Sequence, residues 1–272
     1  MDIPLPFYKP MDGLPGIELS ELIDYLFLFF LSSIRLSAFL ISSPFLGSRT
    51  VPLQAKIVFA MIISFFYFIC ISNYELEKLN LNNLPLLIII ELIIGIASGL
   101  MLTIWFSAAS MAGEKIAAST GLGFSALVDP ETGGQTPVIS IVFDLFLLTI
   151  FISFNGHLLA IDFIVKSHEV LEMGSRAPSM ALIGVGIEAA GAMFYGAGLI
   201  MLPVVGGILL SNVAVGVITK SAPQLNLFSF GFPITIITAF LLLYFSTRSI
   251  GGAFAELTKN SLTTLESVLG IL

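Results

Sequence analysis

The sequence contains little charge and a single cysteine, and each shortage excludes a class of protein. Only 11% of its 272 residues are charged, whereas 57% are hydrophobic, and the mean hydropathy is +1.03. Because about 25% of the residues in a soluble domain are charged, this composition indicates an integral membrane protein. Cys70 lies in an apolar stretch, where a lone thiol supports neither an intrachain disulfide nor a thiolate metal site.

Basic residues are scarce as well. The chain has 11 Lys and Arg residues against 18 Asp and Glu residues, which gives a net charge of −7. Without a basic patch, no nucleic-acid partner is predicted. The first residues lack a cationic segment and the first apolar block is too long for a signal peptide, so we expect no cleavable signal peptide.

The sequence motifs of common enzyme classes are missing. The chain has no His-Glu-x-x-His, no Gly-x-Ser-x-Gly and no nucleotide-binding signature. It also lacks the Gly-x-Gly-Asp pattern of intramembrane aspartyl proteases. On a continuous helix Asp144 and Asp162 are separated by roughly 27 Å, too far to share a proton, unless the helix breaks at Gly156. His157 in an apolar segment is more typical of a hydrogen-bonded interior residue than of a metal ligand. We therefore predict no enzyme, no cofactor and no metal site.

Long apolar segments are what the sequence does contain. We predict an all-α membrane protein with about six hydrophobic helical segments, at residues 22–46, 57–72, 84–109, 138–165, 181–217 and 234–245, followed by a weakly amphipathic tail. The spacing of Gly95 and Gly99 predicts a close approach between helices. The glycine-rich segment 181–217, which contains Pro203, predicts tight helix contacts or a bend rather than a lipid-facing rod.

Several charged residues interrupt these apolar segments. Each costs at least about 2.5–3.5 kcal/mol at a bilayer centre, so it should face protein or water. They could form an ion or proton pathway, or pair with each other or with neighbouring chains, and we favour the structural alternative. The residues concerned are Arg35, Glu91, Asp144 and Glu188. Asp162 and Lys166 are spaced as a pair on one helix face near a segment end.

Residues 119–137 form a loop of small residues, rich in glycine and proline, between two apolar segments. Lipid offers no partners to non-helical backbone, so such a loop lies in water, in protein or in a cavity. Its glycines permit unusual backbone conformations and its prolines limit refolding. Phe124, Leu127 and Val128 could form an apolar constriction, which leads us to place the loop in a pore. The alternative is an ordinary connector outside the membrane.

Five motifs in order, together with Arg35, resemble one protein family across most of the chain. They are PFLGSRTVP at residues 44–52, AGE at 112–114, GLGFSALVDP at 121–130, NGHL at 155–158 and APQLNLFSFGFP at 222–233. The family is that of the flagellar biosynthetic protein FliR, the counterpart of the T subunit of type III secretion export gates. Two of these motifs resemble the flagellar members more than the injectisome members. They are the one that contains Asn155, Gly156 and His157, and the last motif.

The resemblance implies a subunit of a protein-export gate in the bacterial inner membrane, at the flagellar basal body. A single copy would complete a channel with the P and Q subunits (FliP and FliQ), beside the switch protein FlhB, and unfolded exported proteins would pass through it. Residues 1–177 would be P-subunit-like, and residues 178–272 would form a Q-subunit-like helical hairpin and tail.

The resemblance also assigns a plug to the loop at residues 119–137. Its site residues would be Gly121, Gly123, Phe124, Leu127, Val128, Asp129, Pro130, Gly133 and Gly134. Family members often have Phe at the position of Leu127, which should keep a seal, and Gly at the position of Glu131, which leaves a charge here.

Other functions remain as alternatives. The carboxylates Glu91, Asp144 and Glu188 could serve a secondary transporter. The chain could instead be a purely structural scaffold, or an export-gate subunit of an injectisome.

Overall fold

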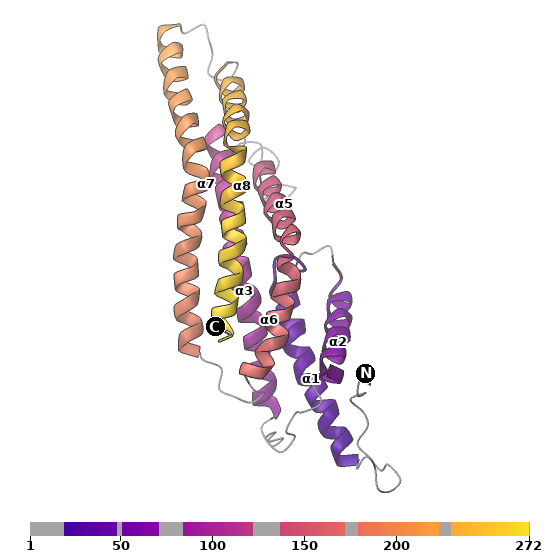
Figure 1. Ribbon diagram of the computed structural model, residues 1–272. Helices are drawn as coiled ribbons and strands as arrows, with labels where there is room; N and C mark the ends of the chain where they lie inside the picture. Colours follow the sequence, from indigo (N-terminus) through magenta and orange to yellow (C-terminus); the bar gives the residue numbers. More distant parts are fainter. Residues whose placement is uncertain are drawn as a thin grey trace, which may run out of the picture. The chain divides into compact units, whose positions relative to one another are not determined.

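A computed structural model describes residues 19–47, 51–70, 84–121, 137–171, 179–222 and 230–271. The regular structure of these residues is entirely α-helical, which confirms the predicted all-α class (Figure 1). The helices are α1 (Leu19–Ser42), α2 (Leu53–Cys70), α3 (Leu84–Thr120), α5 (Val138–Ser153), α6 (Gly156–Val170), α7 (Ser179–Ser221) and α8 (Phe232–Val268).

Two helices extend well beyond their predicted segments. α3 continues past residue 109 to Thr120, through a stretch rich in alanine, the strongest helix former. α8 includes the predicted tail, because this part buries one face at helical spacing. The buried residues along that face are Ile250, Phe254, Leu257, Ser261 and Leu265.

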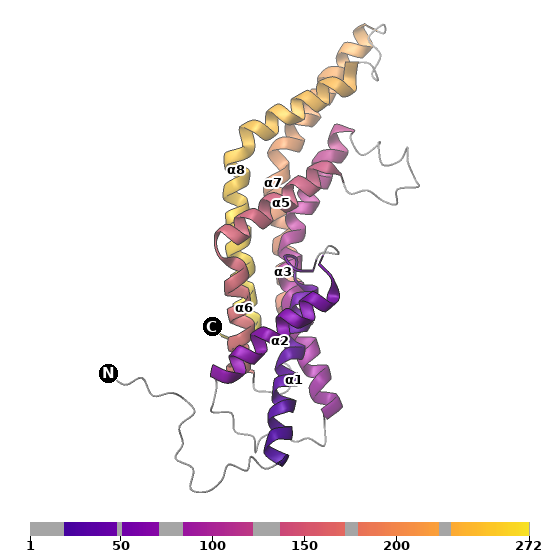
Figure 2. The ribbon, with the colours of Figure 1, turned by 90° about the vertical axis from the view of Figure 1, so that its right-hand side faces the viewer.

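The predicted segment 138–165 is two helices rather than one. α5 and α6 meet at a bend of 66° around Phe154 and Asn155, visible in Figure 2. The break falls next to Gly156, the one position at which the sequence allowed it. α6 also continues to Val170, beyond the predicted end of this segment at residue 165.

The chain forms two compact units, and α3 and α6 each contribute to both. The first unit contains α1, α2, the part of α3 up to Leu100 and the part of α6 from Ile161. The second contains α3 from Met101, the remainder of α6, and α5, α7 and α8.

In the first unit, α1 packs against both α2 and α3. Gly95 and Gly99 of α3 lie directly against the backbone of α1, where a Cβ atom would collide with the carbonyl of Arg35 or with Ser42. The predicted close approach at these two glycines is confirmed. Phe39 of α1 is completely buried beside them.

In the second unit, α5 packs against α8, and α7 and α8 run side by side. Gly196 and Gly207 of α7 contact Leu257 and Leu242 of α8. α3 is joined to α8 by a hydrogen bond from Trp105 Nε1 to Thr264 Oγ1 at 3.1 Å.

The glycines of α7 only partly follow the prediction of tight contacts. α7 is a single helix of 43 residues that continues through Pro203. At Gly184, Gly191, Gly198, Gly206 and Gly216 an added Cβ would meet no atom within 4 Å. These five glycines therefore do not pack against the rest of the described chain.

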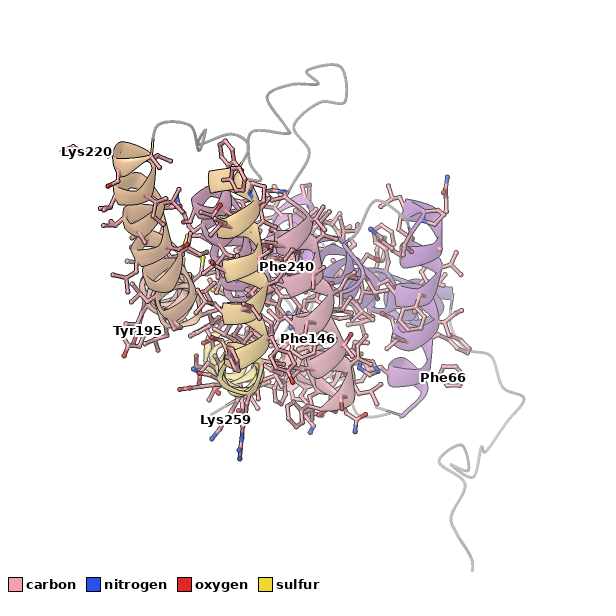
Figure 3. All side chains as sticks on the ribbon, turned by 90° about the horizontal axis from the view of Figure 1, so that it is seen from above. Phe66, Phe146, Tyr195, Lys220, Phe240 and Lys259 are labelled. Atoms are coloured by element: carbon pink, nitrogen blue, oxygen red, sulfur yellow. The ribbon has the colours of Figure 1, made fainter. Side chains whose placement is uncertain are left out.

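Three helices are long and apolar enough to cross a membrane, or four if α5 and α6 together count as one broken span. In the apolar windows of α7 and α8 only 22% and 17% of the residues are buried. Large apolar side chains such as Phe66 on α2 and Tyr195 on α7 project outwards (Figure 3). This surface suits lipid or neighbouring subunits rather than water.

Candidate functional site

The structure describes the two ends of the predicted plug rather than its middle. Gly121 is the last described residue before the loop, and Pro137 is the first after it. Eight predicted plug residues lie outside the described residues, namely Gly123, Phe124, Leu127, Val128, Asp129, Pro130, Gly133 and Gly134. The structure therefore defines the points where the loop leaves α3 and enters α5.

Gly121 ends α3 in a left-handed conformation with φ of +81°. Its N–H donates a hydrogen bond to the carbonyl of Ala118 at 3.3 Å. A left-handed glycine just after the last helical residue is a common helix terminator, because glycine has no Cβ to oppose a positive φ. The loop therefore departs from α3 in a direction that Gly121 fixes.

Side chains from α7 and α8 reach the carbonyls of the last turn of α3. The last four carbonyls of a helix have no partner within it. Asn212 Nδ2 donates to the carbonyl of Ser119 at 3.5 Å. Thr235 Oγ1 lies 3.4 Å from the carbonyl of Thr120 and 3.0 Å from that of Phe232. The end of α3 is thus capped from two other helices.

Phe232, the first residue of α8, packs its ring directly on Gly121. A Cβ built on Gly121 would lie 2.5 Å from Cε1 and 2.7 Å from Cδ1 of that ring. An open pocket of about 420 Å³ adjoins this contact, lined by the last turn of α3, by α7 around Asn212 and by the first turn of α8. No side chain larger than hydrogen fits at position 121 unless the ring moves.

The other end of the loop is fixed by contacts between α3 and α5. The carbonyl of Pro137 accepts the first helical hydrogen bond of α5, from Ser140 N–H at 2.9 Å. A Cβ on Gly113 would lie 2.5 Å from Ser140 Cα, so the two helices touch at backbone distance. Ser140 Oγ donates to the carbonyl of Ser110 at 3.0 Å, and Ser110 Oγ donates to Asp144. The Ala-Gly-Glu motif at 112–114 therefore marks a close helix crossing.

Arg35 and Glu91 form a buried ion pair in the first unit. Arg35 Nε donates to Glu91 Oε2 at 2.6 Å and Nη2 donates to Oε1 at 3.0 Å, while both side chains are at most 1% exposed. The same guanidinium donates to Ser167 Oγ at 2.9 Å and to the carbonyl of Leu171 at 3.1 Å. One arginine therefore ties α1 to α3 and to the end of α6.

The remaining carboxylates singled out by the sequence have separate surroundings. Asp144 accepts the hydrogen bond from Ser110 and is half-buried. Glu188 lies exposed on α7. Asp162 and Lys166 form the expected pair at 2.7 Å, which confirms that prediction. Both oxygens of Glu91 are engaged by Arg35, so that carboxylate is not available to a solute.

Asn155 and Gly156 form the bend between α5 and α6. Asn155 has a positive φ of 55°, and its carbonyl accepts from the N–H groups of Leu158 and Leu159 at 3.0 and 3.1 Å, which starts α6. A Cβ on Gly156 would lie 2.6 Å from the ring of Phe151. His157 follows at the start of α6, and its Nδ1 is buried without a hydrogen-bond partner among the described residues.

The site residues that the structure describes join helices through hydrogen bonds, one buried ion pair and close backbone contacts. Within the described ranges no three His, Cys, Asp or Glu side chains are grouped as a metal site requires. The sequence did not point to three residues of α7 and α8 that contact the end of α3: Asn212, Phe232 and Thr235. Only Phe232 carried a signal, as part of the motif at 222–233; the polar side chains of Asn212 and Thr235 look like ordinary helix residues in the sequence.

Comparison with known proteins identifies the family. The family described as "Bacterial export proteins, family 1" matches residues 26–261. Flagellar biosynthetic protein FliR of Escherichia coli (strain K12) is 32% identical over 222 residues, which cover 79% of this chain and 82% of that protein. The chain belongs to the FliR family. The FliR protein of Bacillus subtilis (strain 168) is 27% identical over 93% of this chain and 98% of its own length. That of Aquifex aeolicus (strain VF5) is 28% identical over 82% of this chain.

Membership of the FliR family confirms the resemblance read from the five motifs. The match begins before Arg35 and ends within α8, so it covers both structural units. All three relatives are named as flagellar biosynthetic proteins.

Proposed function

We propose that this chain is a non-enzymatic subunit of the flagellar type III protein-export gate. In this role it completes the channel built with FliP and FliQ, and residues 119–137 seal that channel until an unfolded substrate passes. The observation that carries the proposal is the family match over residues 26–261, together with relatives named as flagellar biosynthetic proteins.

The described geometry supports the sealing part of this proposal. Each end of the loop is attached to a helix that packs against its neighbours. The carbonyls of Ser119 and Thr120 accept hydrogen bonds from α7 and α8, and Pro137 starts α5, which touches α3 at backbone distance. A segment that blocks a channel must be held at its ends, because otherwise thermal motion would carry it out of the pore. The predicted apolar residues Phe124 and Leu127 would form the seal itself.

The remaining parts of the proposal follow from family membership. Residues 1–177 would be P-subunit-like and residues 178–272 would form the Q-subunit-like hairpin. The subunit would be present once per gate, beside FlhB, in the bacterial inner membrane at the flagellar basal body. The large exposed apolar surface of α7 and α8 is compatible with such neighbours.

Deletion of residues 121–134 tests the proposal directly. In cells that assemble the complete gate, we expect the deletion to let small ions leak through while FliP and FliQ still copurify with the chain. The variant Leu127→Phe serves as the matched control, because a larger apolar side chain should keep the seal. An assembled deletion variant with the ion conductance of the parent would contradict a plug.

The secondary-transporter alternative makes a different prediction. The purified chain, reconstituted alone in liposomes, would move a small solute with saturation kinetics. The pairing of Glu91 with Arg35 and the hydrogen bond of Asp144 do not favour this alternative, since both carboxylates already have protein partners. An injectisome role would be indicated if the chain restored secretion by an injectisome but not by a flagellar gate.

A further inference from the structure

The last turn of α3 is held by two helices that follow it by about ninety residues or more in the sequence. Asn212 of α7 donates to the carbonyl of Ser119, and the hydroxyl of Thr235 of α8 shares its one proton between the carbonyls of Thr120 and Phe232. Thr120 and Thr235 are 1% and 5% exposed, so the contact between them is buried, whereas Asn212 and its contact with Ser119 lie at the surface. A solvent-exposed helix end would need no such partners, because water satisfies its carbonyls.

The ring of Phe232 adds a steric constraint to these hydrogen bonds. It occupies the space where a side chain at position 121 would project, and position 121 must also adopt a positive φ. Two independent requirements thus meet at one residue, since glycine alone satisfies both without strain. Phe232 belongs to the motif at residues 222–233, which the proposed export function does not by itself explain.

We propose that Gly121, Asn212, Phe232 and Thr235 form a latch that positions the start of the plug, so that the seal depends on the α7–α8 hairpin. This inference rests on the proposed function of residues 119–137. The latch fixes the direction in which the chain leaves α3 and prevents the last turn of α3 from unwinding. These four are positioning residues: they act on the seal through the end of α3 and do not line the channel.

Thr235→Val is the sharpest variant, because it removes the hydroxyl and keeps the shape of the side chain. One hydrogen bond contributes about 1 kcal/mol, so its loss should raise the ratio of the released to the held form of the α3 end by a factor of about five. We therefore expect an ion leak through the closed gate about fivefold above that of the parent. Thr235→Ser keeps the hydroxyl and should restore most of the seal.

Thr247→Val provides the matched control on the same helix. Thr247 is exposed, and in the part of the chain that the structure describes its hydroxyl donates to the carbonyl of Leu243, one turn earlier. The substitution makes the same chemical change outside the latch. Its leak should equal that of the parent.

Variants of Gly121 test the packing of the Phe232 ring against residue 121. Gly121→Ala adds a Cβ that meets the Phe232 ring, and it also opposes a positive φ, which together should raise the leak more than Thr235→Val does. The double variant Gly121→Ala, Phe232→Ala removes the clash between the added Cβ and the ring. The strain of a positive φ at residue 121 remains. Gly121→Asn keeps the clash and relieves part of the strain, because asparagine tolerates this conformation.

Three measurements on the assembled gate decide the outcome: copurification with FliP and FliQ, ion leak, and amide hydrogen exchange in the last turn of α3. The latch is supported if Thr235→Val assembles normally, leaks, and exchanges faster at residues 118–121, while Thr235→Ser and Thr247→Val do not. It is overturned if Thr235→Val and Gly121→Ala neither leak nor exchange faster although deletion of residues 121–134 leaks.

Failure of the proposed function gives a different pattern. If the deletion itself does not leak, the plug is wrong, and no latch variant should leak either. Hydrogen exchange remains informative in that case, because faster exchange in Thr235→Val would still show that α8 holds the end of α3. A variant that does not assemble is judged by exchange in the purified chain, where unchanged protection of residues 118–121 counts against the latch.

Discussion

Arg35 and Glu91 show how one residue pair can determine the packing of several helices. Breaking a buried ion pair is costly, because the remaining charge keeps its desolvation penalty and loses its partner. Arg35 also donates to Ser167 and to the carbonyl of Leu171, so four hydrogen bonds from one guanidinium reach three residues, on α3 and at the end of α6. Lysine could not replace it, since an ammonium lacks the planar fork that binds both oxygens of Glu91.

At this scale we predict that Glu91→Ala destabilises the chain by about 3–5 kcal/mol. Arg35→Met should have an effect of similar size, whereas the double variant Arg35→Met, Glu91→Leu should be more stable than either single variant. The thermal unfolding of the purified protein in detergent measures all three.

The exposed pair of Asp162 and Lys166 is the control for this prediction. Because exposed pairs contribute only about 0–1 kcal/mol, Asp162→Asn should leave the unfolding temperature almost unchanged. If Glu91→Ala and Asp162→Asn shifted the unfolding temperature equally, burial of the Arg35–Glu91 pair would not add to stability.

Gly113 and Gly184 differ in how closely other atoms surround them, and this difference leads to a second prediction. Gly113→Ala should destabilise the chain, because its Cβ would lie 2.5 Å from the backbone of Ser140. Gly184→Ala should be neutral or stabilising by about 0.5–1 kcal/mol, since alanine favours a helix and nothing lies within 4 Å of the added atom. Thermal unfolding of the two variants of the isolated chain checks this difference, and a loss of stability in Gly184→Ala equal to that in Gly113→Ala would contradict it.

At the scale of elements, the bend between α5 and α6 depends on backbone conformation. Asn155 lies in the left-handed region, where asparagine and glycine are tolerated and β-branched residues are strained. Gly156 allows the ring of Phe151 to close over the bend, and that ring stacks edge-on against Phe106 at 5.2 Å. The 66° change of direction therefore depends on the backbone conformation of Asn155 and on the packing of Phe151 against Gly156.

We predict that Asn155→Val destabilises the bend by about 1–2 kcal/mol, whereas Asn155→Gly leaves it close to the parent. The free energy of unfolding in denaturant measures both variants. Equal stability of the two would mean that the left-handed conformation of residue 155 does not limit the fold.

At the scale of the whole molecule, the main feature is apolar surface that the described residues leave uncovered. Few residues of the apolar windows of α7 and α8 are buried, and Tyr195 and Leu202 stand on the open side of α7. In the isolated chain this surface must contact lipid or detergent. In a complete export gate, neighbouring subunits would cover part of it.

We therefore predict that a lipid-soluble photolabel modifies positions such as Tyr195 and Leu202 in the isolated chain and modifies them much less in the assembled gate. Mass spectrometry of the labelled peptides gives the ratio for each position. Phe66 on α2 provides a comparison in the other unit. Equal labelling of Tyr195 and Leu202 before and after assembly would mean that this face of α7 stays in lipid.

The sequence by itself determined the membrane class, the all-α fold and the family. Hydrophobic content and the length of apolar segments depend only on composition and order, so they can be read without coordinates. Helical spacing also placed Gly95 and Gly99 on one face, which predicted a close approach but not its partner α1, and it paired Asp162 with Lys166 on one helix. The helix break next to Gly156 was allowed by the sequence but not required by it.

Only the tertiary structure decided which helix ends meet which side chains. The pairing of Arg35 with Glu91 and the capping of α3 by Asn212 and Thr235 join residues that lie 56 to 115 positions apart in the sequence. Such contacts depend on which helices cross and at what point. The periodicity of a single sequence shows which face of a helix is apolar, but not which other helix packs against it. The lengths of α3 and α8 were underestimated for a related reason: their polar ends are stabilised by burial of one face, which composition does not reveal.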